Sequence, residues 1–355
     1  MKPKHVRKLL MSEIKSVADN PQTYCYNPHT DFTRKRKFTM ERILSGTGSN
    51  GQKPYNLLHL NGLFDLNHCV YSDAIIQKSK QSNEHKAFTE MVDRSNIAKA
   101  LVIADSGYES YNNLAHIQEK GWFYLIRIKD GIHGIKEGLD LPLEDTFDVD
   151  ISLKLTRKQT KETKELFKVR NHYRFVPSNV VMDYLPQKNK KADPIKFYEL
   201  SFRIVRFQIT EDTYETVITS LERNDYPAKR LKELYASRWG IETSFRDLKY
   251  TIGMLDFHSK KVMCIQQEIY AHLIMYTFAE MITSHVVIEN KQRKHTYKAN
   301  FSVATHMCRL FYLKKTTSPN LEAIIAKNLI PIRPDRHRER NLCGKIYHSF
   351  LYRVA

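Results

Sequence analysis

The chain has 355 residues, which is long enough for two or three domains with substantial cores. Hydrophobic residues make up 41% and charged residues 27%, a globular composition that excludes a largely disordered chain. Its 57 lysines and arginines stand against 39 acidic residues, and the formal charge of +18 indicates a polyanionic partner. On charge alone, a basic enzyme or a ribosome-associated protein is an equally valid interpretation.

Cysteine usage and hydropathy predict a cytoplasmic protein with no membrane segment. The five cysteines are odd in number and form no C-x-x-C pair, so we expect reduced thiols rather than a zinc site. The basic amino-terminal stretch lacks the apolar core of a secretory signal. The most apolar window, 269–288, contains His272, Glu280 and His285, which is typical of a buried helix rather than a membrane span.

The first fifty residues predict a helical and basic segment. Residues 3–18 have the pattern of a short amphipathic helix, and Arg34–Lys37 is a run of four basic residues. Such a run is most often a solvated surface, with DNA contact as the second interpretation. The glycine-rich stretch 45–51 then predicts a flexible linker that closes the segment 1–50.

The next segment, 51–130, predicts an α/β sheet that carries Asp105 at a strand end. Expected elements alternate between strand and helix, an order that favours some parallel pairing. Ligands of such sheets bind outside the carboxyl ends of the strands, and Asp105 directly follows an apolar strand. The expected elements are a hairpin over 55–64 and 69–77, a helix capped by Ser82 through Arg94, a strand over 98–104, a helix over 111–119 and a strand over 122–128.

A change of period predicts a β-rich insertion over 131–222. Residues 147–156 alternate between apolar and polar side chains, and 197–209 and 214–221 are further β-prone runs. Helix resumes after Pro227, with a disturbance expected from Gly240 to about Tyr250. We therefore expect a second part of the α/β core over 223–290 and a basic carboxyl-terminal segment over 291–355.

Within this late helix, Tyr235, Arg238, Glu242 and Lys249 occupy relative positions 0, 3, 7 and 14. On a continuous helix these four side chains fall on one polar stripe roughly 60° wide. A guanidinium, an ammonium and an aromatic ring suit a surface that meets phosphates, and a carboxylate suits a metal ion. The simpler alternative is that Glu242 only forms an ion pair with Arg238 or Arg246.

The same four residues match Y-x2-R-x3-E-x6-K, and the chain here resembles the DDE transposases of the fourth insertion-sequence family. The stretch Ile103–Tyr108 (IADSGY) is similar to the family's second-aspartate motif. The resemblance extends from Lys53 to about Ile288. It implies an α/β fold with an RNase H-like core interrupted by a β-rich insertion, and with helical amino- and carboxyl-terminal segments.

This resemblance also implies a chemistry and partners. Asp105 and Glu242 are the expected catalytic residues and metal ligands, and Tyr235, Arg238 and Lys249 the expected DNA-binding residues. Two Mg²⁺ or Mn²⁺ ions would serve cleavage and strand transfer at the ends of an insertion sequence. The expected partners are double-stranded DNA, as terminal inverted repeats and target, and a second copy of the chain in a synaptic complex.

The sequence departs from the family at the first catalytic aspartate. Family members carry it on an apolar strand before the segment that corresponds to YNLLHLN, and no such strand precedes this segment here. Asp65 and Asp73 lie in the expected hairpin, and Asp31 lies in the amino-terminal segment. We therefore predict an internal deletion and impaired catalysis. The alternatives are a non-catalytic DNA-binding remnant that acts at transposon ends or as an inhibitor, and a stand-alone nuclease.

Overall fold

The computed structural model describes residues 12, 58–78, 81–129, 134–187, 193–255, 257–259, 261–286, 296–313 and 320–332. The chain divides into two compact units. We call Leu58–Leu66 together with Ser72–Glu242 the sheet unit. The described residues of Asn67–Tyr71 and of the chain from Thr243 onward form the helical unit.

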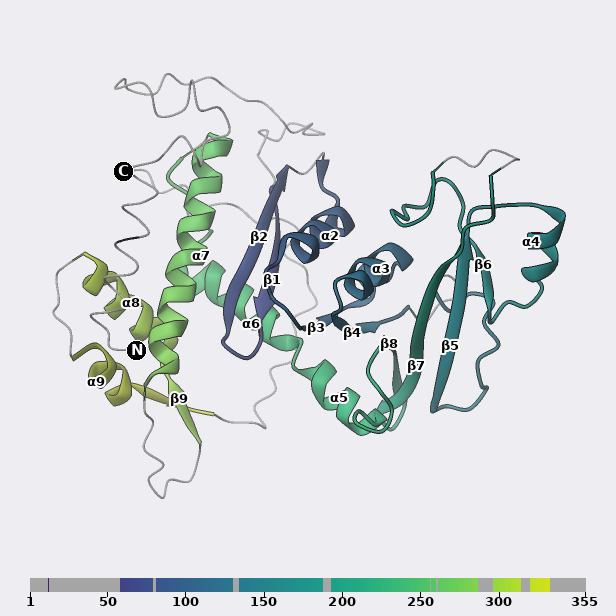
Figure 1. Ribbon diagram of the computed structural model, residues 1–355. Helices are drawn as coiled ribbons and strands as arrows, with labels where there is room; N and C mark the ends of the chain where they lie inside the picture. The colour runs from purple at the N-terminus through teal and green to yellow at the C-terminus, as the bar shows by residue number, and fades with distance from the viewer. Residues whose placement is uncertain are drawn as a thin grey trace, which may run out of the picture. The chain divides into compact units, whose positions relative to one another are not determined.

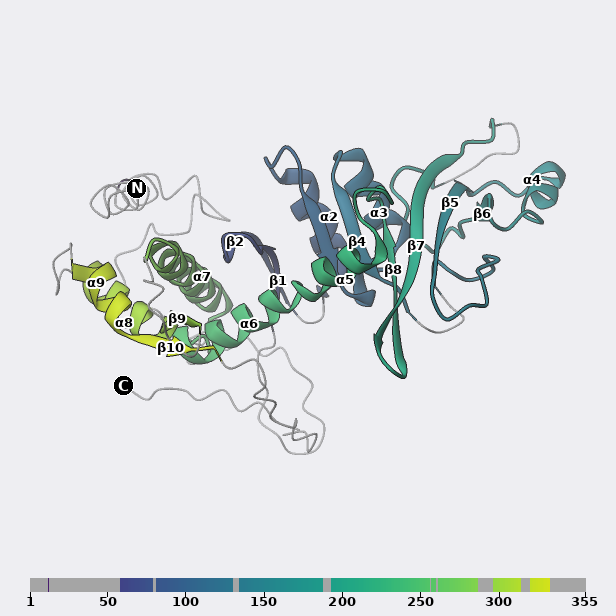
Figure 2. The same cartoon turned by 90° about the horizontal axis from the view of Figure 1, so that it is seen from below.

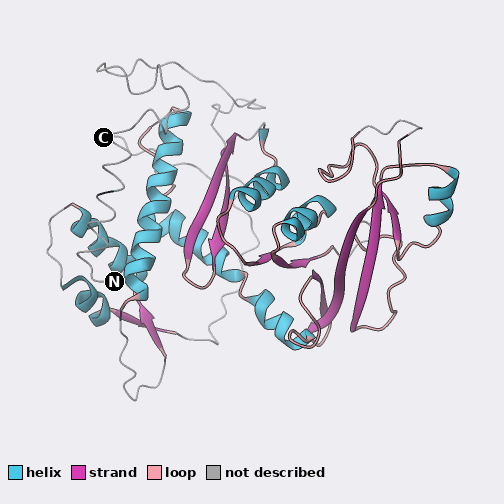
Figure 3. Ribbon diagram, viewed as in Figure 1, coloured by secondary structure: helices cyan, strands magenta, loops and turns pink. Residues whose placement is uncertain are grey.

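A mixed sheet of six strands forms the centre of the sheet unit, with the order β3-β4-β8-β7-β5-β6 (Figures 1 and 3). The pairs β3-β4 and β5-β6 are parallel, and the three pairings between them are antiparallel. Strand β8 therefore lies between β4 and β7, so the sheet is continuous across the predicted insertion. The strands are β3 (Leu101–Ala104), β4 (Phe123–Arg127), β5 (Phe147–Thr156), β6 (Tyr173–Phe175), β7 (Tyr198–Thr210) and β8 (Thr213–Thr219).

A separate two-stranded sheet precedes the six-stranded one in the chain. It consists of β1 (Leu58–Asp65) and β2 (Val70–Lys78), joined by a turn in which Cys69 adopts a positive φ of 56°. Helix α2 (Glu84–Arg94) follows, and its amino end is capped by Asn83, whose side chain accepts a hydrogen bond from the Lys86 amide. The other helices that begin in the sheet unit are α3 (Tyr111–Glu119), α4 (Lys161–Leu166), α5 (Ala228–Ala236) and α6 (Trp239–Asp247).

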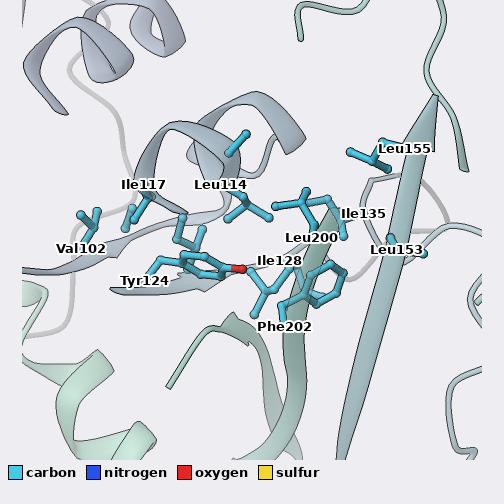
Figure 4. Close-up of a cluster of buried hydrophobic side chains, with 14 of the residues drawn as sticks. Val102, Leu114, Ile117, Tyr124, Ile128, Ile135, Leu153, Leu155, Leu200 and Phe202 are labelled. Atoms are coloured by element: carbon cyan, nitrogen blue, oxygen red, sulfur yellow. The ribbon is translucent and has the colours of Figure 1, made fainter. Parts of the chain in front are cut away.

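Both faces of the central strands are buried because successive side chains point to opposite sides of the sheet. One face packs against α2 and α3, where Val102 and Tyr124 lie near Leu114 and Ile117 (Figure 4). The opposite face packs against α5, and its buried apolar cluster consists of Leu125, Val205, Phe207, Val217, Leu221, Leu231 and Tyr235. The sheet unit therefore has three layers, with the strands between two layers of helices.

Long helices dominate the helical unit. Helix α6 leads into a π-helical turn at Leu248–Ile252, which ends at Gly253 in the left-handed conformation. The remaining elements are α7 (Val262–Ser284), α8 (Phe301–Tyr312), α9 (Asn320–Lys327) and the short antiparallel strands β9 (Tyr297–Ala299) and β10 (Leu329–Pro331). The core between α7, α8 and α9 contains Phe278, Ile282, Cys308, Phe311, Leu321 and Ile325.

The observed elements confirm the mixed α/β class and the parallel strand–helix–strand pattern around Asp105. One local prediction is wrong, because the cap of α2 is Asn83 rather than Ser82. Two others are refined by the structure. The predicted buried helix at 269–288 is α7, which begins earlier and exposes 44% of Tyr270 and 57% of Ile274. The β-rich segment also contains helix α4, which begins with a Thr160 capping box.

Several predictions fall on parts of the chain outside the described residues. These are the helix at 3–18, the basic run at 34–37, Asp31, the glycine-rich linker and the end of the basic segment 291–355. The predicted domain limits stay predictions.

Candidate functional site

Asp105 lies at the carboxyl end of β3, on the side of the sheet that faces α5. Strand side chains alternate, and Ile103, two residues earlier, packs against the α5 cluster. The Asp105 backbone is extended, and its Oδ1 accepts a hydrogen bond of 2.9 Å from the Gly107 amide. The carboxylate thereby caps the 3-10 turn Ser106–Tyr108. One of its two oxygens is thus engaged in local structure.

Glu242 lies in α6 and forms an ion pair with Arg238. The distance from Arg238 Nη1 to Glu242 Oε1 is 2.8 Å, and 14% of the arginine and 41% of the glutamate side chain are exposed. The guanidinium also lies 5.1 Å from the ring centroid of Trp239 and 5.7 Å from that of Tyr235. Of the two ion pairs left open by the sequence, the one with Arg238 is therefore present.

The helix that carries these residues is not continuous, so the prediction of a single polar stripe is wrong. Helix α5 ends before Ser237, α6 begins at Trp239, and the π-helical turn shifts the phase again after Asp247. Tyr235 is 5% exposed and packs in the apolar cluster beneath α5. Lys249 is exposed and belongs to the π-helical turn of the helical unit.

Two buried donors near Asp105 have no hydrogen-bond partner among the described residues. They are the hydroxyl of Tyr235 and Nε of Arg238. Burial raises the pKa of Tyr235, and Asp105 and Glu215 raise it further, whereas Arg238 and Arg127 lower it. The tyrosine is therefore protonated at neutral pH and has a proton to donate.

Electrostatics place Asp105, Tyr235, Arg238 and Glu242 in one neighbourhood. Burial lowers the pKa of Arg238, but its hydrogen bond to Glu242 and the nearby charges, including Asp105, raise the pKa above its ordinary value. The guanidinium therefore stays charged. We call these four residues the Arg238 cluster.

Two residues beside the Arg238 cluster were missed from the sequence. Arg127, at the end of β4, forms an ion pair of 3.5 Å with Glu215 on β8 and lies close enough to influence Tyr235. Trp239 is 53% exposed and contacts the Arg238 guanidinium. Trp239 directly follows Arg238 in the motif, so its position in the sequence was a signal that could have identified it. The proximity of Arg127 depends on the β4-β8 pairing, which has no local signal.

The described residues do not fit a complete two-metal site. They contain no group of three His, Cys, Asp or Glu side chains arranged to hold a metal ion. Asp105 caps a turn and Glu242 pairs with Arg238. Asp73, a substitute considered from the sequence, receives hydrogen bonds of 2.7 Å and 2.6 Å from Arg94. Asp65, the other one, is the last residue of β1.

Comparison with known proteins gives one family. The family model described as transposase DDE domain matches residues 29–278, about 70% of the chain. A comparison with curated protein sequences finds no match. Among the described residues, no helix combines the length and the apolar character needed to cross a membrane.

Proposed function

Because the chain belongs to the transposase DDE domain family, we propose that it acts on the DNA ends of an insertion sequence, with Asp105 and Glu242 as its catalytic carboxylates. Family membership makes the chain a transposase of a mobile element and implies that it binds DNA. The Arg238 cluster is the single observation that carries the finer proposal. It gathers residues of both matched motifs in one unit, although they lie at least 130 positions apart in the sequence.

The proposed contact is between the Arg238 cluster and a phosphodiester. Phosphate oxygens accept hydrogen bonds only, and the charged guanidinium of Arg238, 14% exposed beside the 53% exposed Trp239, is a donor that they favour. The formal charge of +18 adds a long-range attraction. Binding of this kind weakens steeply as salt rises, because each neutralised phosphate releases counterions. Lys249 is proposed as a further phosphate contact.

An RNase H-like core interrupted by an insertion is the fold that we propose for this activity. The support is the parallel β3-α3-β4 unit with Asp105 at its end, followed by the β-rich segment before α5. The strands β5, β7 and β8 extend the sheet that begins with β3 and β4.

Catalysis in this copy is expected to be impaired. Divalent metal ions serve the family's chemistry in general, and Asp105 and Glu242 are the ligands that we propose for any ion that binds here. A third carboxylate is absent from this place among the described residues. Arg238 also competes with a cation for Glu242. We therefore assign to the chain's own residues the binding and orientation of DNA, with weak cleavage and strand transfer at most.

The Arg238–Glu242 ion pair favours one alternative function. A carboxylate neutralised by an arginine suits a non-catalytic DNA-binding protein, which occupies transposon ends or inhibits an intact transposase with which it pairs. A synaptic complex of two copies is part of both proposals.

One experiment separates these functions. The full chain is mixed with DNA that carries the flanking ends of its own gene, with Mg²⁺ or Mn²⁺, and nicking and mobility shifts are measured. The variants are Asp105→Asn and Glu242→Gln. The matched control is Glu165→Gln, a residue of α4 whose side chain is 70% exposed and pairs with Lys168.

Nicking at the ends that both site variants abolish and the control retains would support a working transposase. A shifted but uncut band would support the non-catalytic alternative. Cutting without preference for the ends would support a nuclease, and the absence of DNA binding at low salt would overturn all three.

A further inference from the structure

Strand β3 is an edge of the six-stranded sheet, and its outer side has open backbone groups. In its parallel pairing with β4, the Phe123 amide donates to the Ala100 carbonyl, and Leu101 is the register partner of Phe123. In a parallel ladder this register directs the amides of Val102 and Ala104 toward β4. The amides and carbonyls of Leu101 and Ile103 therefore point outward, where no partner occurs among the described residues.

Strand β3 is short, with four residues, but within it the open side carries no charge, proline or bulge that would discourage pairing. Natural edge strands carry a lysine, a proline or a bulge that discourages pairing with another chain. The sequence of β3 is LVIA, and its register with β4 is regular. Val102 and Ala104 are buried under the helices, as in a strand from the middle of a sheet. Strand β3 thus has the apolar composition of a central strand, although among the described residues it pairs with β4 on one side only.

The helix layer over this edge continues past it to β1. Helix α2 packs against both α3 and β1, and Figures 1 and 2 both place it between them. Leu63 of β1 packs against the same apolar cluster as Val102 and Phe88. In the strand layer, however, β1 is paired with β2 in a sheet of its own. The helices therefore cover a longer stretch than the hydrogen-bonded strands beneath them.

From this interruption we infer that the outer edge of β3 is a docking site for one extended strand of a second polypeptide. The occupant forms main-chain hydrogen bonds with Leu101 and Ile103, the mode of binding known as strand addition. It carries apolar, β-branched residues at alternate positions, because the side chains on one of its faces lie under α2. The inference rests on the pairing of β3 and stands independently of the proposed function.

The docked strand ends beside the Arg238 cluster. Asp105 directly follows β3, so a strand that extends along Leu101–Ala104 passes next to this carboxylate at one end. A partner that adds a strand here therefore lies next to Asp105 at one end.

Backbone N-methylation of a peptide tests the proposal directly. The probe is a fluorescent peptide of alternating valine and threonine with a lysine at its amino end, titrated into the full chain without DNA or metal. Two further peptides carry N-methyl groups on one or the other alternate set of amides. Strand addition uses only one set, so one methylated peptide binds at least about tenfold more weakly and the other binds within about threefold of the parent.

Amide hydrogen exchange supplies an internal control within β3. On peptide binding, exchange of the Leu101 and Ile103 amides slows at least about tenfold, whereas the Val102 and Ala104 amides, already bonded to β4, change little. Three results would each overturn the proposal: no binding of the parent peptide, equal binding by both methylated peptides, or full protection of Leu101 and Ile103 in the free chain. Since the assay contains no DNA, failure of the proposed function leaves its outcome unchanged.

Discussion

Replacement of Arg203 by methionine is expected to destabilise the sheet unit by about 3 kcal/mol. The Arg203 side chain is 6% exposed on β7, and its Nε donates to Asp148 Oδ1 at 3.1 Å. Its Nη1 donates to the carbonyls of Leu221 at 2.7 Å and Tyr226 at 3.3 Å, in the connection that leads into α5. Methionine fills a similar volume but leaves the buried Leu221 carbonyl, the partly buried Tyr226 carbonyl and one carboxylate without this donor.

The magnitude follows from what the Asp148 carboxylate retains. Breaking a buried ion pair costs roughly 3–5 kcal/mol, but Asp148 is 23% exposed and keeps Arg223 at 3.2 Å, so the lower end applies. Burial raises the pKa of Asp148, yet its hydrogen bonds to Arg203 and Arg223 hold the pKa below the ordinary value. The stabilisation is therefore present at neutral pH and is lost as the pH falls below the ordinary aspartate range.

Urea unfolding followed by tryptophan fluorescence measures this effect, because both tryptophans, Trp122 and Trp239, lie in the sheet unit. The matched control is Arg223→Met. The Arg223 side chain is 47% exposed and contacts the same Asp148, so we expect this variant to lose less than about 1 kcal/mol of unfolding free energy. If the two variants lose equal stability at pH 7, burial of the Arg203 contacts is not what stabilises this connection.

Three further changes test other parts of the structure. Asn83→Ala removes the cap of α2 and is expected to cost about 1 kcal/mol in urea unfolding, whereas Asn83→Ser retains most of it. Gly107→Ala places a methyl group 3.0 Å from Asp105 Oδ1; it should reduce DNA nicking, while stability changes by less than about 1 kcal/mol. Burial raises the pKa of Glu280 to about 7, so ionising it opposes folding, and the unfolding free energy should fall as pH rises from 5 to 8. Circular dichroism should show a flatter pH profile for Glu280→Gln.

Local patterns in the sequence were sufficient for elements that make local contacts. Helix α3 has the predicted bounds because its apolar residues recur at helical spacing between a serine and a glycine. Strand β5 was predicted from a strict alternation of side chains, and all of its predicted residues lie in the observed strand. In both cases the burial pattern repeats within a few residues, so the sequence of the element alone is sufficient to predict it.

The features that the sequence could not supply depend on distant contacts. The break between α5 and α6 and the burial of Tyr235 against β4 and β8 are both features that a helical wheel cannot show. The insertion of β8 between β4 and β7 also has no local signal, because side-chain alternation reveals a strand but not its neighbours. The motif spacing identified the residues of the Arg238 cluster, but the ion pair and the unpaired donors required the tertiary structure.

The pairing of β4 with β8 has a consequence for synthesis of the chain. The Thr219 hydroxyl donates to the Tyr124 carbonyl across a separation of 95 residues. A growing chain therefore emerges from the ribosome with β3 and β4 complete, while the free edge of β4 and the face that packs against α5 stay uncovered until β8 and α5 follow. At roughly 5–20 residues per second this interval lasts several seconds, long enough for chaperones to bind or for neighbouring nascent chains to aggregate.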